Sequence, residues 1–309
     1  MKYYIGLDGG GTKTHCVLAN DKKEKVYECY GGPANFLILG TETVTQTLYD
    51  LVKESMQKNN VRYGEIEAIT IGATGAGRKS DADRLESEFR KFCQSKDFKP
   101  KNVFVDSDAR IALEGAFSGR PGCIMIAGTG SILYGKDIKG RLYRVGGFGR
   151  FLGDEGSGYM IGKKGLIAVA KAFDGRGETT IMQNLLFNAS NINTPEELIT
   201  EIYKNNYDIA SFAPLVLQAA NQGDVIARKI LDEEVEELLL HLVAIKRKLL
   251  LNVIEVSLVG SLISNPNFFS NLLLEKVKTK MPEIRITSPE NNPAMGAVFY
   301  SVNKLAGLI

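Results

Sequence analysis

The sequence predicts an α/β protein of two domains, each built on a mixed sheet, with a cleft between them. Its 309 residues suit two compact domains better than one or three. Short apolar runs alternate with helical patterns, and the order strand, glycine-rich turn, strand occurs twice, at 3–19 and at 123–134. We therefore expect domains at 1–118 and 119–309, with the seam in a segment that contains glycine and proline.

The first half begins with two apolar runs, 3–7 and 15–19, on either side of three glycines, which predicts two strands joined by a turn. An apolar stripe at Val44, Leu48, Leu51 and Val52 has the spacing of one helix face. The other elements expected in this half are strands at 25–30, 68–72 and 103–105 and helices around 85–92 and 109–117.

The second half repeats the opening pattern and then becomes mainly helical. An apolar run at 123–127, a turn at 128–131 and a strand at 132–134 lead into a hairpin at 136–143. After a glycine-rich loop at 146–158, helical patterns continue to residue 251, and a buried strand follows at 253–259. A last helix at about 294–305 is placed where it can pack back on the N-terminal domain.

Composition excludes several classes of function. Lys plus Arg number 38 and Asp plus Glu number 36, so a net charge of +2 gives no electrostatic footprint for nucleic acid. No apolar run is long enough to cross a bilayer, and the N-terminal run is too short for a signal peptide. Four cysteines without a CxxC pair favour a reducing, cytoplasmic setting over disulfides or a cysteine metal cluster.

Two glycine-rich turns are candidate phosphate sites. Successive glycines let an anion approach backbone N–H groups, Thr12 adds a hydroxyl donor, and Asp8 can hold a hydrated Mg²⁺ beside the same phosphates. Gly128–Ser131 is a second such turn, so a nucleotide held between two turns in a cleft is one use of the repeat. The alternative is a duplicated hairpin with a structural role only.

Several acids and one amide have the chemistry of a transfer site. Asp106 and Asp108 follow a buried strand, and either could accept a proton from an attacking hydroxyl, although Asp108 could instead cap the next helix. The loop 146–158 holds six glycines around Asp154, whose carboxylate could bind sugar hydroxyls, unless the loop is simply a mobile surface segment. Asn35 could bind a hydroxyl or form an Asx turn.

Six segments together resemble the BadF/BadG/BcrA/BcrD ATPase family, and within it the N-acetylglucosamine kinase branch. They are IGLDGGGTKT at 5–14, GGPAN at 31–35, DA at 108–109, AGTGS at 127–131, GGFGRFLGDEGSG at 146–158 and VGS at 259–261. The resemblance implies the fold of actin, sugar kinases and Hsp70, in which two duplicated ribonuclease-H-like domains close on ATP and Mg²⁺.

By position, the resemblance also implies roles for individual residues. Asp108 would be the catalytic base, with Asp106 as the fallback, and Asp8 would organise Mg²⁺ through water. The amino sugar would contact Asn35, Gly147, Phe148 (a Trp in some relatives) and Asp154. The residues implied for ATP are Gly9, Gly10, Gly11, Thr12, Lys13, Thr129, Gly130, Ala220, Gly260 and Ser261.

The implied activity is ATP-dependent phosphorylation of the primary hydroxyl of an N-acetylated amino sugar, N-acetylglucosamine or N-acetylmuramic acid or both. A homodimer is implied as well, because relatives commonly pair. One alternative is an ATPase activator of a 2-hydroxyacyl-CoA dehydratase, which the scattered cysteines disfavour because such activators need an iron–sulfur cluster. Another is a regulator that binds sugar or ATP without catalysis.

Overall fold

The computed structural model describes residues 1–309 and divides into two compact units. Unit 1 comprises Met1–Gly122, Lys136–Leu142 and Ser288–Ile309, and unit 2 comprises Cys123–Gly135 and Tyr143–Thr287. Each unit contains one five-stranded sheet with helices, so the α/β class is confirmed. The chain passes between the units near residues 122, 135, 142 and 287. The sequence suggested one seam after residue 118 and a last helix that packs back on the N-terminal domain.

The sheet of unit 1 has the order β3-β2-β1-β4-β5. Its strands are β1 (Tyr3–Gly9), β2 (Thr14–Asn20), β3 (Lys25–Gly31), β4 (Ile66–Ala73) and β5 (Val103–Ser107). Short turns make β1, β2 and β3 antiparallel, whereas helical connections make β4 and β5 parallel to β1. The carboxyl ends of β1, β4 and β5 therefore meet at one edge, where Asp8, Thr74 and Asp108 lie.

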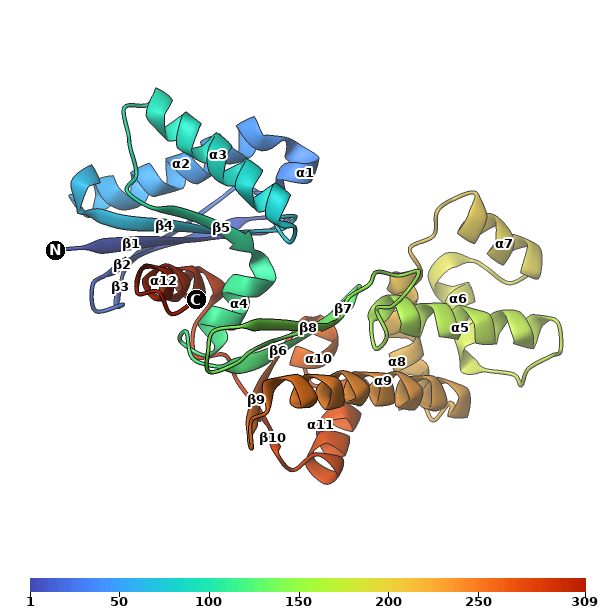
Figure 1. Ribbon diagram of the computed structural model, residues 1–309. Helices are drawn as coiled ribbons and strands as arrows, with labels where there is room; N and C mark the ends of the chain where they lie inside the picture. The colour runs from blue at the N-terminus through green and yellow to red at the C-terminus, as the bar shows by residue number, and fades with distance from the viewer. The chain divides into compact units, whose positions relative to one another are not determined.

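Helices cover both faces of this sheet (Figure 1). One face carries α1 (Phe36–Leu39), α2 (Thr41–Lys58) and α3 (Lys79–Ser95), with a short 3-10 turn at Tyr63–Glu65, and the other carries α4 (Asp108–Ala116) and α12 (Pro293–Leu305). The last helix packs on α4, β1, β4 and β2. Gly6 permits this close approach, because a Cβ there would lie 2.0 Å from the carbonyl oxygen of Ala294.

A buried ion cluster fastens segment 136–142 to the rest of unit 1. Lys136 donates from Nζ to Glu114 and to the carbonyl of Gly119 at 2.9 Å, and Arg110 reaches the other oxygen of Glu114 at 2.9 Å. All three side chains are buried. Because these three charged side chains are shielded from water, each needs an oppositely charged partner; an unpaired buried charge would strongly destabilise the fold.

Unit 2 repeats the strand order of unit 1. Its sheet has the order β10-β9-β6-β7-β8. If the strands of each unit are numbered along the chain, both sheets have the order third, second, first, fourth, fifth, read from β3 in unit 1 and from β8 in unit 2. The strands are β6 (Gly122–Ala127), β7 (Ser131–Lys136), β8 (Leu142–Gly146), β9 (Ile254–Val259) and β10 (Ile284–Thr287). The shared order confirms that the two halves are duplicated folds, as the repeated strand-turn-strand pattern predicted.

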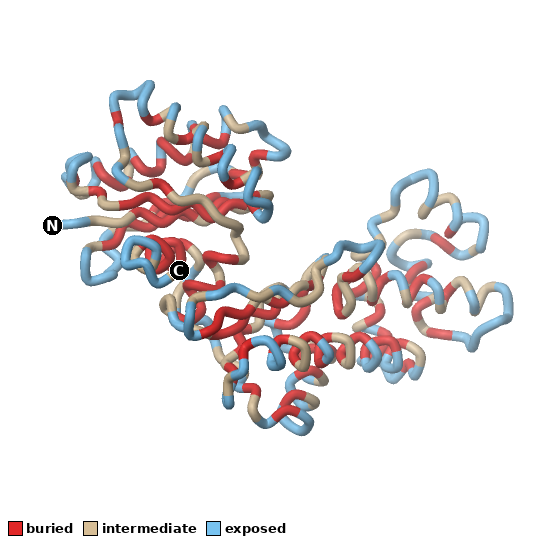
Figure 2. The backbone as a smooth tube through the Cα atoms, in the orientation of Figure 1, coloured by how far each residue is buried: buried red, intermediate tan, exposed pale blue.

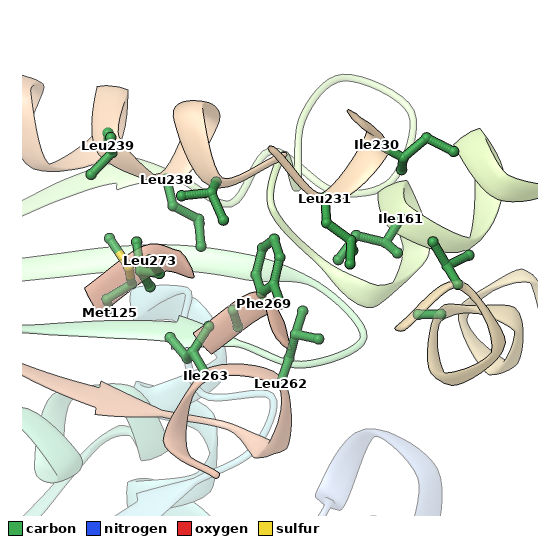
Figure 3. Packing of buried hydrophobic residues seen from close by; sticks show 14 of the residues in the cluster. Met125, Ile161, Ile230, Leu231, Leu238, Leu239, Leu262, Ile263, Phe269 and Leu273 are labelled. Carbon is green, nitrogen blue, oxygen red and sulfur yellow. The ribbon is translucent and has the colours of Figure 1, made fainter. Parts of the chain in front are cut away.

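Helices make up most of unit 2. They are α5 (Gly158–Phe173), α6 (Ile181–Ser190), α7 (Pro195–Tyr203), α8 (Ala213–Asn221), α9 (Val225–Leu249), α10 (Ser261–Ser264) and α11 (Phe268–Lys280), with a 3-10 turn at Ile209–Phe212. Buried residues run along the sheets and the inner helix faces (Figure 2). In the core of unit 2, Phe269 packs near Leu262 and Leu273, with Leu231 and Leu238 of α9 beside it (Figure 3). No helix has the length and apolarity that a membrane span requires.

Candidate active site

The glycine turn of unit 1 presents free backbone donors. Gly10 closes the turn by donating its N–H to the carbonyl of Lys13 at 3.0 Å, and its own carbonyl accepts from Ala34 at 3.0 Å. The N–H groups of Gly11 and Thr12 have no partner in the chain, and both residues are exposed. A Cβ at Gly11 would meet nothing within 4 Å, so the space in front of these donors is open. Such a turn can bind phosphate oxygens.

Asp8 lies at the end of β1, half-buried, and its carboxyl is electrostatically perturbed. Burial, and then the nearby carboxylate of Asp108, raise the pKa of Asp8 from 3.8 to about 6, while Lys13 opposes this effect. A divalent cation would relieve the repulsion between the two carboxylates. The structure has no cluster of three or more His, Cys, Asp or Glu side chains. One or two carboxylates fit Mg²⁺, which keeps several waters and shares phosphate oxygens.

Asp108 is oriented by a threonine that the sequence analysis did not identify. Thr74, in the loop after β4, donates its hydroxyl to Oδ2 of Asp108 at 2.8 Å. The backbone N–H of Thr74 donates to the carbonyl of Gly9 at 3.0 Å. One residue therefore connects the candidate base to the glycine turn. The parallel pairing of β1, β4 and β5 brings Thr74 to these groups.

The first turn of α4 separates the roles of the two neighbouring acids. The helix N-cap is Ser107, whose hydroxyl accepts from the N–H of Arg110 at 3.1 Å, so the capping role considered for Asp108 is wrong. Asp106 accepts from the N–H of Ser107 at 2.7 Å and from Tyr300 of α12. Burial, and then Asp106, raise the pKa of that phenol. Asp108 likewise accepts from the N–H of the next residue, Ala109, at 2.8 Å. The two acids differ in their other contact, which is Tyr300 for Asp106 and Thr74, beside the glycine turn, for Asp108.

Asn35 occupies the N-cap of α1. Its Oδ1 accepts from the N–H of Leu37 at 3.2 Å. The side-chain carbonyl of Asn35 therefore forms the Asx turn that was the alternative to ligand binding. The amide nitrogen has no partner in the chain and the residue is only half-buried. The donor half of this amide therefore stays available to a ligand.

The second glycine turn belongs to unit 2 and lies against a helix start. Gly128 donates its N–H to the carbonyl of Gly130 at 2.9 Å. The carbonyls of Gly128 and Thr129 accept from Gly158 at 2.8 Å and from Tyr159 at 3.1 Å, in the first turn of α5. The N–H groups of Thr129 and Gly130 have no partner in the chain. Free donors beside a helix N-terminus favour anion binding.

A cavity of about 240 Å³ opens beside this turn. Its walls include Gly128, Thr129, Pro214, Leu217 and Ser261. Gly260 lets β9 approach β6, because its φ is +98° and a Cβ would lie 2.3 Å from the carbonyl oxygen of Ala127. Ala220, by contrast, is fully buried in the core of α8 and does not line this cavity. Its helix supplies Pro214 and Leu217 instead, which sequence reasoning missed.

The loop 146–158 folds back on the same turn. Asp154 has a φ of +62°, accepts from the N–H of Gly149 at 3.2 Å, and lies so close that a Cβ on Gly130 would be 2.9 Å from its Oδ2. Asp154, Thr129 and Gly130 line one cavity of about 520 Å³, with walls completed by Arg150, Phe151, Tyr159, Ile202 and residues 206–209. Gly147 and Phe148 do not line it; Phe148 is 70 % exposed.

Comparison with known proteins gives a consistent result. The family model for the BadF/BadG/BcrA/BcrD ATPase family matches residues 5–301. An N-acetylmuramic acid/N-acetylglucosamine kinase of Clostridium acetobutylicum is 37 % identical over 306 residues, covering 97 % of this chain and 98 % of the relative. An N-acetyl-D-glucosamine kinase of Dictyostelium discoideum is 28 % identical over 315 residues, with coverage of 97 % and 98 %.

A solved structure from Chromobacterium violaceum, provisionally named an N-acetylglucosamine kinase, superposes with a TM-score of 0.69 at 23 % identity. The match covers 96 % of this chain and 98 % of that one. At this identity the likeness concerns the fold.

Proposed function

Because the chain belongs to the BadF/BadG/BcrA/BcrD ATPase family, we propose that it is an ATP-dependent kinase for the primary hydroxyl of an N-acetylated amino sugar. Its fold is that of actin-like ATPases, and the relatives named above are amino-sugar kinases. The observation that carries the proposal is the placement of Asp108, which Thr74 ties to a glycine turn with free donors. N-acetylglucosamine and N-acetylmuramic acid are the proposed substrates.

Phosphate binding is assigned to the two glycine turns. In unit 1, the free N–H groups of Gly11 and Thr12, in the turn that begins at Gly9 and Gly10, would hold phosphate oxygens together with the side chains of Thr12 and Lys13. In unit 2, the N–H groups of Thr129 and Gly130 would do so. Mg²⁺, held near Asp8 through water, would neutralise charge on the phosphates. The cavity beside Gly260 and Ser261, with its apolar wall from Pro214 and Leu217, fits a nucleoside.

Proton transfer is assigned to Asp108. When the sugar hydroxyl attacks the γ-phosphorus, the carboxylate accepts the hydroxyl proton and the bond from the γ-phosphorus to the ADP oxygen breaks. Thr74 is a positioning residue, because its hydroxyl donates to Oδ2 of Asp108, while Oδ1 accepts from the backbone N–H of Ala109 at 2.8 Å. The sugar itself would meet the free amide of Asn35 and the carboxylate of Asp154, with Gly147 and Phe148 in the adjoining loop.

Two finer expectations stay predictions. A second copy of this chain is the proposed partner, and the cytoplasm, where ATP is made and used, is the proposed location. The exposed apolar side chains of Phe151, Ile199 and Tyr203 beside a groove of about 580 Å³ are compatible with such pairing. Sedimentation velocity at several protein concentrations measures the assembly directly.

The test is a substrate panel with product identification. The purified chain is given ATP and Mg²⁺ with N-acetylglucosamine, N-acetylmuramic acid, glucosamine, N-acetylmannosamine or glucose, and phosphorylated products are located by NMR. We expect a 6-phosphate of one or both N-acetylated gluco-configured sugars. Sugar binding without any phosphate ester would favour the regulator over the kinase.

The activator alternative finds no support in the cysteines. All four thiols are buried, and burial raises the pKa of Cys93 and of Cys123 to about 12, which disfavours the thiolate that a cluster iron needs. Cys16 and Cys29 face each other across β2 and β3 inside unit 1.

A further inference from the structure

One cation in the cavity of unit 2 has no anionic partner. The guanidinium of Arg150 lies 5.0 Å from the ring centre of Phe151 and 6.0 Å from that of Tyr159, and no carboxylate of the chain pairs with it. Arg150 lines the same cavity of about 520 Å³ as Thr129, Gly130 and Asp154. The two aromatic faces restrict the side chain without neutralising its charge.

The neighbouring cations are already engaged or lie elsewhere. Arg144 donates to the carbonyls of Gly146 and Gly147 and stacks over Phe148. Lys164 pairs with Glu233 and Glu234 at 2.9 and 2.8 Å. Lys163 lines the adjoining apolar groove rather than this cavity. Arg150 is therefore the cation that this cavity offers to an anionic group.

The acids of the cavity do not compete for Arg150. Asp208 caps the 3-10 turn that follows it, accepting from the N–H of Ala210 at 3.1 Å. Asp154 accepts from Gly149 and is oriented by the backbone of its own loop. That loop is tightly wound, since Leu152 and Gly153 both donate to the carbonyl of Gly149, at 3.1 and 2.9 Å. Arg150 and Asp154 therefore line the same cavity without forming an ion pair with each other.

We propose that Arg150 binds the carboxylate of N-acetylmuramic acid and so determines whether this sugar is accepted; this inference rests on the proposed function. N-acetylmuramic acid differs from N-acetylglucosamine by a lactyl ether on O3 that ends in a carboxylate. Asp154 accepts hydrogen bonds from sugar hydroxyls, which carry protons to donate, whereas the carboxylate has none and meets the guanidinium. An arginine fork binds a carboxylate through two parallel hydrogen bonds, and a cavity of this volume holds one substituted monosaccharide.

The experiment compares Arg150→Gln, Arg150→Lys and wild type on both sugars. The readout is the ratio of kcat/KM for N-acetylmuramic acid to kcat/KM for N-acetylglucosamine. A loss of activity that is common to both sugars cancels in this ratio. A charged hydrogen-bond pair predicts a fall of this ratio by about tenfold to hundredfold in Arg150→Gln and a smaller fall in Arg150→Lys. Lys163→Gln removes a nearby positive charge outside the cavity, and its ratio should equal that of wild type.

A neutral probe identifies the group that Arg150 contacts. With the lactyl carboxylate converted to its amide, wild type and Arg150→Gln should show the same ratio. Thermal unfolding checks that each variant is folded.

Three outcomes would overturn the inference: an unchanged ratio in Arg150→Gln, an equal fall in Lys163→Gln, or wild type that phosphorylates N-acetylglucosamine and neither binds nor phosphorylates N-acetylmuramic acid. Calorimetric binding of both sugars separates this inference from the proposed function. Binding of N-acetylmuramic acid that depends on Arg150, with no phosphate transfer to either sugar, would uphold the inference and refute the kinase.

Discussion

The two units share a strand order but support their glycine turns in different ways. In unit 1 the turn is fixed by neighbouring strands and loops, through Ala34 and Thr74, and two carboxylates lie beside it. In unit 2 the turn is fixed by the first residues of α5, and Thr129 and Gly130 open into cavities instead. The duplicated frame has therefore diverged: two carboxylates lie beside the turn of unit 1, whereas the turn of unit 2 lines cavities.

The largest effect should follow from Asp108→Asn. Loss of the base should lower kcat by about a thousandfold, while nucleotide binding, measured by calorimetry, stays near the wild-type value. Asp106→Asn is the matched control from the same strand end. It should lower kcat less than tenfold, because Asp106 contacts Tyr300 within the fold. Equal losses in the two variants would refute the assignment of the base.

The next largest effect is on stability and compares an alanine substitution at one glycine of each unit. Gly260→Ala must place a Cβ 2.3 Å from a carbonyl at a φ of +98°, so it should lower the free energy of unfolding by about 2–4 kcal/mol in urea titrations. Gly11→Ala meets nothing within 4 Å and should change that free energy by less than about 0.5 kcal/mol. If both substitutions lower the free energy of unfolding equally, close backbone packing at Gly260 and open space at Gly11 do not distinguish the two glycines.

The pH dependence of stability tests the carboxylate pair of unit 1. The folded pKa of Asp8, about 6, lies above its unfolded value near 3.8, so the folded chain retains a proton that the unfolded chain releases. The free energy of unfolding should therefore fall as the pH rises from about 4 to about 6, by on the order of 1–2 kcal/mol after allowance for solvent screening. Asp8→Asn should remove this slope in urea titrations; an unchanged slope would contradict it.

The smallest effect is expected from Thr74. Thr74→Val removes the hydrogen bond that orients Asp108 and should lower kcat about tenfold with KM for ATP and sugar nearly unchanged. Thr74→Ser keeps the hydroxyl and should restore most of kcat. A variant Thr74→Ser as slow as Thr74→Val would indicate a packing role only.

Much of the fold could be predicted because its signals are local. The strand-turn-strand repeats, the hairpin ending near Tyr143 and the helix around 85–92 all depend on neighbouring residues, and the structure has them. The four-residue strand β10 was missed because its pattern is too short to read. Lys136, a charged residue in an otherwise ordinary strand, gave no sign of its buried pairing with Glu114.

The candidate site was predictable as a set of motifs and not as a set of contacts. The resemblance carried Asp108, but Thr74 lies 34 positions earlier and meets it only through parallel strand pairing. Ala220 was carried over to the right helix, yet the helix turns Leu217 toward the cavity and Ala220 into the core. Such details depend on helical phase and strand register, which one sequence does not fix.

The position of α12 has a consequence for how the chain is made. Val17 and Ala19 of the second strand complete their core only with Ala294, Val298 and Phe299 of the last helix. During synthesis, all residues of unit 2 are translated before α12, which shares one face of the unit 1 sheet with α4. Loss of α12 would therefore destabilise a sheet whose strands precede the whole of unit 2 in the chain.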